Sequence, residues 1–377
     1  MKRLNKIPET FSFSGKDFER HVSEAARDEA LTAQLRKKAD EFMSKKSPCV
    51  TDRKIRAASG DIHDYSSFGP YWWPNPDTES GLPYIRRDGE VNPETKDNIT
   101  FSMLFSSVEV LTLAAYCFGD DKYADKAVRN IMSWYIDEDT RMNPHLKYGQ
   151  AIPGICSGRG IGLIDCADSY KLFDCVGLLD AMGVIPGEVI SGLKSWYSRF
   201  LDWMLTSEIG VDEDRQHNNH GSWYDVQVAS AALFLNRKIL AQRQLSLAYE
   251  RRVLKHIDNE GKQPHELART KAIGYSTMNL RALMLLANLS QSAGCKLDMW
   301  HEKREDGSIA LKSALDYLKQ FAKSLEGFKY SQIDGKPNPE GASMLMTMAA
   351  RHYPGEGYEK QAEEFYNPAM LWRLLPL

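Results

Sequence analysis

Two short segments of the sequence concentrate side chains that could do chemistry. The first is His217-Asn218-Asn219-His220, which places two imidazoles and two amides just before an apolar run. The second includes a carboxylate, a guanidinium and a phenol at Glu266, Arg269 and Tyr275. Side chains of these types donate hydrogen bonds to anions and transfer protons, so the two segments are candidates for one acid–base site.

Each segment also has a purely structural interpretation. The two histidines of the first segment, at spacing i, i+3, could hold a metal on one helix face, but the sequence supplies no third ligand beside them. We therefore predict neither a metal nor a cofactor, and the Asn and His residues could instead cap a helix that begins near Ser222. In the second segment, Glu266 and Arg269 could form a surface ion pair, and Tyr275 could be a half-buried core aromatic.

The elements that must position these residues are helices. Almost every long segment after residue 98 has apolar residues at helical spacing, and no alternating run rich in Val, Ile and Thr indicates a sheet. The segment Ile99 to Phe118, which Gly119 ends, forms a helical hairpin with Lys122 to Ile136. An amphipathic stretch, Asp17 to Ser44, opens the chain. Further helices are expected over Ile164–Leu179, Pro186–Leu205, Ser222–Leu235, Arg237–Ile257, Tyr275–Ala293, Ser308–Leu325, Gly341–Arg351 and Tyr358–Leu374.

Helical hairpins of this kind bury their apolar faces by stacking, either as an open solenoid or as a closed ring. The sequence has no clean internal repeat, so we favour the ring. The predicted fold is all-α, an (α/α) toroid or incomplete barrel of about six to seven helical hairpins. We expect residues 1–377 to form a single domain.

Two stretches break the helical rhythm, and long ordered loops over a helical scaffold make binding surfaces. The first, residues 59–98, is rich in Gly, Pro, Asn and aromatic residues and is the predicted substrate-binding loop. The second, residues 142–162, contains Gly158-Arg159-Gly160-Ile161-Gly162. This run lacks the third glycine of a dinucleotide loop at the right offset, and no strand precedes it, so we interpret it as a turn before the next helix.

Composition limits the partners. The 377 residues include 48 Lys+Arg against 51 Asp+Glu, a net charge of -3, with no basic run, so we expect no nucleic acid partner. A polyanionic ligand would need local cations. No apolar run approaches the roughly 18 residues of a membrane span, and we expect no membrane partner. The six cysteines are scattered without a metal-type pair, as for buried small hydrophobes or at most one disulfide.

The residues of the two segments, taken together, match a family. The pair Asn219-His220, followed by Pro264, Glu266, Arg269 and Tyr275, resembles the alginate lyase family of helical-toroid polysaccharide lyases. Members of that family open one helix with an Asn-His pair and complete the site with a Pro-x-Glu-x-x-Arg segment and a nearby Tyr. The segment Tyr71 to Pro74 is similar to the N-terminal substrate loop of relatives, and the resemblance extends over about residues 60–290.

The resemblance implies an enzyme that cleaves an anionic polysaccharide, alginate or glucuronan, by β-elimination. The C5 proton of a uronate is not acidic while the neighbouring carboxylate is anionic, so donors must first neutralise that carboxylate. Asn219, His220 and Arg269 have the hydrogen-bonding groups for this role. Tyr275 is the candidate acid and base. Because a free phenol has a pKa of about 10, Tyr275 needs a neighbouring cation or imidazole to favour the phenolate.

The stereochemistry favours one substrate. In mannuronate and glucuronate the C5 proton and the C4 oxygen lie on the same side of the ring, so one tyrosine can serve both. Guluronate needs a separate base, for which His220 is the reserve. We expect mannuronate-rich alginate as the substrate, with glucuronan as the alternative because the two sugars differ only at C2. The predicted substrate contacts are Tyr71, Trp72, Trp73, Arg86, Arg87, Gln150, Arg159, Tyr224 and Glu266.

Other interpretations stay open from sequence alone. A glycoside hydrolase on a similar ring would need two catalytic carboxylates, which Asp61, Asp64, Asp77 and Asp225 could supply. A non-catalytic carbohydrate-binding protein is the other alternative. We expect a monomer. The family resemblance implies a periplasmic or secreted protein whose export signal precedes this sequence, and the alternative is a cytoplasmic protein, because the polar N-terminus lacks a signal-peptide core.

Overall fold

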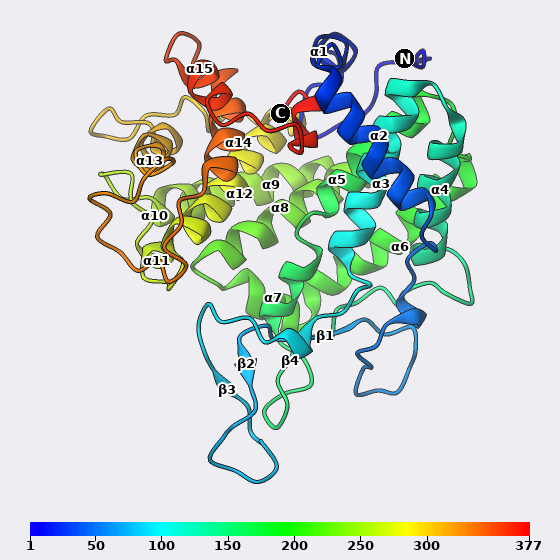
Figure 1. The fold of residues 1–377 in the computed structure, drawn as a ribbon, viewed down its shortest axis with the longest axis vertical. Coiled ribbons are helices and arrows are strands. Elements are labelled where there is room, and N and C mark those ends of the chain that lie inside the picture. Colours follow the sequence, from blue (N-terminus) through cyan, green and yellow to red (C-terminus); the bar gives the residue numbers. More distant parts are fainter. The chain divides into compact units, whose positions relative to one another are not determined.

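The computed structural model describes all 377 residues and consists mainly of helices (Figure 1). The chain divides into two compact units. Unit 1 comprises Met1–Glu213, Phe234–Asn236 and Leu371–Pro376, and unit 2 comprises Asp214–Leu233, Arg237–Met370 and Leu377. The expectation that residues 1–377 form one domain stays a prediction.

Unit 1 is organised around the apolar helix α3. The hydroxyl oxygen of Thr100 accepts a hydrogen bond from the Met103 N–H and so caps its start, and Gly119 ends it in the left-handed conformation at φ 66°. Helices α2, α4 and α5 pack against α3. The helices of unit 1 are α1 Phe18–Ala25, α2 Glu29–Met43, α3 Phe101–Phe118, α4 Asp121–Tyr135, α5 Ser169–Ala181, α6 Gly187–Thr206 and α7 Glu208–Asp214.

By length and composition, α3 is one helix that could cross a membrane, with a mean hydropathy of 1.6. The expectation that no apolar run approaches a membrane span was therefore wrong for this segment. Within the protein, 67% of the helix is buried, which is the environment of a core helix.

The opening stretch Asp17 to Ser44, predicted as one amphipathic segment, contains two helices. The first helix ends before Asp28. The Asp28 side chain accepts hydrogen bonds from the N–H groups of Ala30 and Leu31 and so caps the start of α2. An Asp within a helical pattern is therefore a cap here rather than an interior residue.

Two pairs of short strands interrupt the helical pattern. Strand β1, Ser66–Phe68, pairs in parallel with β4, Tyr148–Ala151, and β2, Trp72–Trp73, pairs antiparallel with β3, Ile85–Arg86. The sequence has no alternating run long enough to indicate a sheet, and these short strands were therefore missed. Strands of two to four residues are too short to show a period-two pattern, so periodicity could not reveal them.

Unit 2 is organised around the 22-residue helix α12 (yellow in Figure 1), against which α9, α11, α13 and α14 pack. Its helices are α8 Asn219–Phe234, α9 Lys238–Ala248, α10 Leu254–His256, α11 Pro264–Leu267, α12 Ala272–Ala293, α13 Ala310–Lys319, α14 Pro339–Ala350 and α15 Tyr358–Glu363. The predicted helix Arg237–Ile257 contains a π-helical turn at Tyr249–Val253, and the predicted helix Tyr358–Leu374 ends at Glu363.

The extended N-terminal segment of unit 1 is held by α5. The buried carboxylate of Asp174 accepts hydrogen bonds from the Phe11 N–H at 2.5 Å and from the Ser12 hydroxyl. One turn later, Gly177 lies against the Glu9 carbonyl so closely that a Cβ would overlap it. Burial raises the pKa of the Asp174 carboxyl to about 7, although the donors from Ser12 and Phe11 lower it.

Replacing this carboxyl should change how stability depends on pH. Because the folded-state pKa of Asp174 lies above its ordinary value, protonation of the group favours the folded state. Its contribution is full below about pH 4 and is lost as pH rises through 7. The Asp174→Asn variant cannot ionise, so the unfolding free energy of the wild type relative to this variant should fall by up to roughly 4 kcal/mol between about pH 4 and pH 8. Urea denaturation over this pH range checks this prediction, and a difference that stays constant would contradict it.

Candidate active site

The first candidate segment starts helix α8, three residues earlier than predicted, and a buried arginine fixes this start. Arg252 donates to the carbonyl of Gln216 at 2.5 Å, to the carbonyl of Asp214 at 2.6 Å and to the carboxylate of Asp225 at 2.8 Å. Gly221 lies against the guanidinium so closely that a Cβ would overlap it. These contacts fix the conformation of the segment before α8. Asn219 and His220 consequently lie in the first helical turn.

The two amide side chains of this segment, those of Asn218 and Asn219, bind different partners. The side chain of Asn218 accepts a hydrogen bond from the His220 N–H at 3.1 Å, so Asn218 is the helix cap that the structural interpretation expected. Asn219 is 1% exposed and turns inward, where it meets Glu266. The cap and the inward-facing amide are neighbours in sequence but have different partners.

Glu266 holds Asn219 by two hydrogen bonds. Its carboxylate accepts the Asn219 main-chain N–H at 2.6 Å and the Asn219 side-chain Nδ2–H at 2.7 Å. Burial raises the pKa of the Glu266 carboxyl, while the Asn219 donors and the charges of Arg269 and His220 lower it. Glu266 was predicted as a substrate contact, but it is 1% exposed and binds a neighbouring residue, so the geometry assigns it the positioning of Asn219.

Arg269 and Tyr275 form the second half of the cluster. The Arg269 guanidinium donates to the Tyr275 hydroxyl at 2.8 Å and lies 3.8 Å from the ring centre. The guanidinium thus contacts both the oxygen and the ring face of the phenol. Its positive charge would stabilise the negative charge of a phenolate. Within unit 2, Asn219 is thus hydrogen-bonded to Glu266 and Tyr275 to Arg269, and the charges of Arg269 and His220 both act on the Glu266 carboxyl.

Helix α12 presents Tyr275 on its less buried face. Gly274, Tyr275, Met278 and Arg281 are half-buried, whereas most of their neighbours along the helix are buried. Gly274, Met278 and Arg281 line a cavity of about 400 Å³ together with residues of α14. The cavity therefore lies beside the start of α12, although Tyr275 itself does not line it.

Unit 1 holds another arginine, Arg159, on a platform formed by Gln150 and Trp72. Arg159 donates to the Gln150 carbonyl at 3.1 Å and to the Gln150 side-chain oxygen at 2.9 Å, and Trp72 lies 5.9 Å from its guanidinium carbon. It makes no ion pair with a carboxylate. Burial lowers the pKa of the Arg159 guanidinium, which indicates a partly desolvated cation.

Gln150 is fixed in turn by groups that sequence reasoning missed. Its main-chain φ is 49°, in the left-handed region that few non-glycine residues adopt. Its N–H donates to the Ser67 hydroxyl at 2.8 Å, and Ser67 donates to Asp165 at 2.5 Å. Asp165 also accepts from the Gln150 amide at 3.4 Å. This network spans the β1–β4 pair, which carries no sequence signal.

The glycine run around Arg159 serves close packing. Gly162 lies against the backbone of Gly149, and Gly158 lies against the backbone of Lys147 and Tyr148, so side chains at these glycines would overlap β4 or the residue before it. A 3₁₀ helix, Gly160–Cys166, begins within the run. The run thus leads into a helix, as its sequence indicates, but the expectation that no strand precedes it was wrong, because β4 ends at Ala151.

The remaining predicted substrate contacts are less built into the structure. Arg86 is exposed and pairs with Asp88 at 2.6 Å, and Arg87 is exposed with its guanidinium 5.1 Å from the Trp73 ring. Tyr71 is half-buried and its carbonyl accepts the Arg87 N–H. Their substrate roles stay predictions. So does that of Tyr224, which is 2% exposed.

Three of the four carboxylates that a hydrolase would use have other partners. Asp225 is fully buried and pairs with Arg251 and Arg252. Asp64 is buried and accepts a hydrogen bond from Asn143 at 2.7 Å, and Asp61 binds the same amide at 3.1 Å. Asp77 is exposed, and one available acid is fewer than the two that hydrolysis requires.

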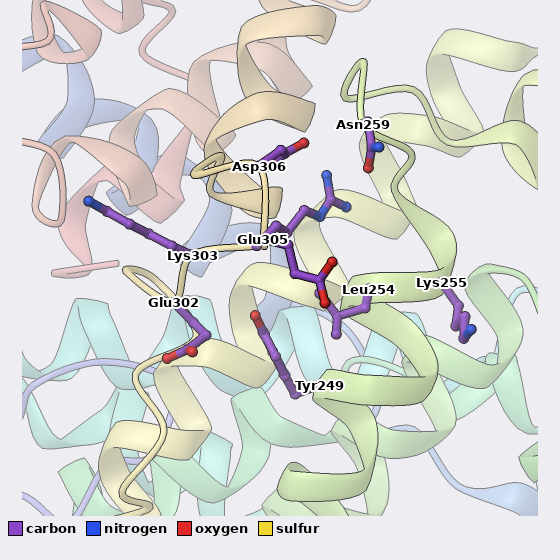
Figure 2. A pocket seen from close by; sticks show the side chains of 9 residues that line it. Tyr249, Leu254, Lys255, Asn259, Glu302, Lys303, Glu305 and Asp306 are labelled. Atoms are coloured by element: carbon purple, nitrogen blue, oxygen red, sulfur yellow. The ribbon is translucent and has the colours of Figure 1, made fainter.

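Two further features of unit 2 have no assigned role. His217 and His265 pack ring against ring with centroids 4.6 Å apart, and no group of three or more His, Cys, Asp or Glu residues in the chain could hold a metal ion. A cavity of about 700 Å³ lies beside the π-helical turn. It is lined by charged residues of both signs with Tyr249 and Leu254 (Figure 2). None of the residues around Glu266 and Arg269 lines it.

Comparison with known proteins agrees with this fold. The family model described as alginate lyase matches residues 49–328. A crystal structure of an alginate lyase from Bacteroides ovatus superimposes with a TM-score of 0.91 at 34% identity, covering 98% of this chain and 100% of that one. Alginate lyase A1-III from Sphingomonas species A1 has a TM-score of 0.56 at 15% identity, covering 90% of this chain and 93% of that one. Comparison with curated proteins found no match.

These findings identify an all-α polysaccharide lyase, and they confirm the fold class predicted from the sequence. The chain belongs to the alginate lyase family. A variant of A1-III bound to a tetrasaccharide has the same fold at 14% identity and a TM-score of 0.56. The resemblance stated from the residue pattern around Asn219 and Tyr275 is thereby confirmed at the level of the family.

The Glu266 carboxylate should matter for turnover through Asn219. In Glu266→Gln, one of the two Asn219 donors faces an amide N–H instead of an oxygen. Because a hydrogen bond to a charged group contributes about 1.5–3 kcal/mol, we expect kcat to fall by about 10- to 100-fold. The exposed Glu302→Gln is the control and should keep wild-type kcat. Steady-state kinetics on alginate measures both, and equal kcat values for the two variants would contradict the positioning role.

Proposed function

We propose that this protein cleaves mannuronate-rich alginate by β-elimination with Tyr275 as both base and acid. The Arg269–Tyr275 contact is the observation that carries this proposal. It keeps the positively charged guanidinium beside the phenolic oxygen that must lose and regain a proton. The family supports the polysaccharide lyase reaction, and the assignment of individual roles is our inference.

The reaction begins with neutralisation of the substrate carboxylate. Asn219 and His220 donate to the uronate carboxylate in the +1 sugar, which lowers the cost of removing the adjacent C5 proton. Glu266 holds the Asn219 amide in place for this contact, as its two hydrogen bonds to Asn219 support. Both donors lie in the first turn of α8, where the helix N-terminus favours an anion.

Proton transfer and bond cleavage follow at one side chain. The Tyr275 phenolate takes the C5 proton, the C4–C5 double bond forms, and the bond from C4 to the glycosidic oxygen breaks. The newly formed phenol then gives its proton to the departing oxygen, which regenerates the phenolate beside Arg269. The step consumes no water and needs no other reactant, so its products are a new reducing end and an unsaturated sugar.

Mannuronate preference follows from the use of a single tyrosine. The C5 proton and the C4 oxygen of mannuronate lie on one face of the ring, within reach of one phenol, whereas guluronate places them on opposite faces. With His220 assigned to the carboxylate, guluronate would lack a dedicated base. We further propose that the protein works as a monomer on polymer outside the cytoplasm, since a polysaccharide does not cross a membrane unaided.

Removal of the phenolic oxygen tests the central role. Tyr275→Phe keeps the ring and its packing under Arg269 but has no group to carry the proton, so we expect kcat to fall by at least about 1,000-fold, within the range that acid–base groups contribute. Polymer binding should change little. Ultraviolet absorbance of the unsaturated product on mannuronan, guluronan and glucuronan measures the rate and the preference. Turnover near the wild-type rate would contradict the proposal.

The two kinds of arginine in unit 1 should behave differently. Arg159 is half-buried without a carboxylate partner, so we propose that it binds a uronate carboxylate of the polymer, whereas the exposed Arg20 pairs with Asp17. Arg159→Ala should raise KM about tenfold and weaken the salt dependence of KM, with kcat changed less. Arg20→Ala is the matched control, with KM expected within about twofold because exposed pairs contribute little. Equal KM values for both variants would contradict the assignment to Arg159.

A further inference from the structure

The chain between Arg269 and Tyr275 is held by a second segment, far along the sequence. Residues Ser331, Gln332 and Ile333 run antiparallel beside it, with a bridge between Lys271 and Gln332. The Ile333 N–H donates to the Thr270 carbonyl at 3.0 Å, and the Ala272 N–H donates to the Ser331 carbonyl at 3.1 Å. This clamp, residues 331–336, acts on the five residues that separate the guanidinium from the phenol.

Gln332 supplies a helix cap that α12 lacks locally. The residue at the capping position of α12, Lys271, makes no side-chain cap. The side-chain oxygen of Gln332 instead accepts the Ile273 N–H at 3.1 Å. Ile273 is the second residue of the helix, and its N–H is one that an N-cap side chain normally satisfies. The cap therefore comes from a residue 59 positions further along the chain, by the difference between 332 and 273.

The Gln332 side chain is itself held in one orientation. Its amide nitrogen donates to the Asp334 carboxylate at 2.8 Å and to the Lys336 carbonyl at 3.2 Å. With the nitrogen occupied by two acceptors, the oxygen must face the start of α12. The orientation of the amide is thus determined by the loop and not by the helix it caps.

We propose that Gln332 is a positioning residue for catalysis, which sets the first turn of α12 and thereby the place of the Tyr275 hydroxyl under Arg269. This inference rests on the proposed function of Tyr275. Tyr275 is the fourth residue of the helix, so a shift of the first turn moves the phenol directly. Residues at the far end of α12 would keep their positions. The family match ends at residue 328, so the clamp lies outside the matched residues.

The chain offers a matched control at the opposite end of the same helix. The amide of Gln242, on α9, donates to the Ala293 carbonyl at 2.9 Å and to the Gly294 carbonyl at 3.4 Å, where α12 ends. Gln242 and Gln332 are therefore two glutamines that satisfy backbone groups at the two ends of one helix. Only Gln332 does so next to the phenol.

The test compares Gln332→Met with Gln242→Met, since methionine keeps the length of glutamine without its polar atoms. We expect Gln332→Met to lower kcat on mannuronan about 10- to 100-fold, as a small misplacement of a reacting group does, with KM within about twofold. Gln242→Met should keep wild-type kcat. Equal kcat for the two methionine variants would overturn the proposal.

Hydrogen exchange separates this inference from the proposed function. Amides of residues 270–276 should exchange faster in Gln332→Met, and those near residue 293 should exchange faster in Gln242→Met. Unchanged exchange at 270–276 would overturn the clamp whatever the activity. If the wild type released no unsaturated product, the proposed function would fail, while the exchange result would still decide whether Gln332 holds the start of α12.

Discussion

The Arg269 guanidinium lies 3.8 Å from the centre of the Tyr275 ring and donates to its hydroxyl oxygen, so the phenol has a fixed positive charge beside it. An uncharged phenol in water is a weak base at neutral pH, and a neighbouring cation is the simplest way to favour its ionised form. The two residues are six positions apart, and their contact depends on the conformation of the intervening chain. Much of unit 2 can be understood as the means of holding that conformation.

Three of the candidate site residues lie near the start of a long helix. Asn219 and His220 open α8, and Tyr275 is the fourth residue of α12. A helix N-terminus offers free N–H groups and a positive partial charge, which suit a bound carboxylate and a phenolate alike. Each start is fixed by a remote side chain: Arg252 holds the chain before α8, and Gln332 caps α12. Backbone groups at the site are thus satisfied by parts of the chain that do not react.

The sequence predicted the long helices well because their signals are local. The helical spacing of apolar residues from Ile99 to Phe118, with Gly119 after it, defined α3 almost to the residue, and the grouping of Asn219, Arg269 and Tyr275 led to the correct family. What sequence could not predict depends on contacts between distant segments. Glu266 resembled a surface or substrate-facing carboxylate, but its burial against Asn219 follows only from the packing of α11 beside the start of α8.

Other features had no usable signal for the same reason. The platform under Arg159 depends on the parallel pairing of two very short strands and on a left-handed Gln150, and neither leaves a pattern in the sequence. Gln332 lies in a polar loop where nothing distinguishes it from its neighbours. Its role arises because that loop folds back on residues 270–273, which only the three-dimensional arrangement reveals.

A crystal structure of the Tyr275→Phe variant with a mannuronate tetrasaccharide would test the central claim most directly, because the slow variant should retain the uncleaved tetrasaccharide in the site. The account predicts that one sugar carboxylate accepts hydrogen bonds from Asn219 and His220, and that C5 and O4 of that sugar both face the ring at position 275 beneath Arg269. A sugar whose carboxylate binds elsewhere, or whose C5 and O4 turn away from that ring, would contradict it.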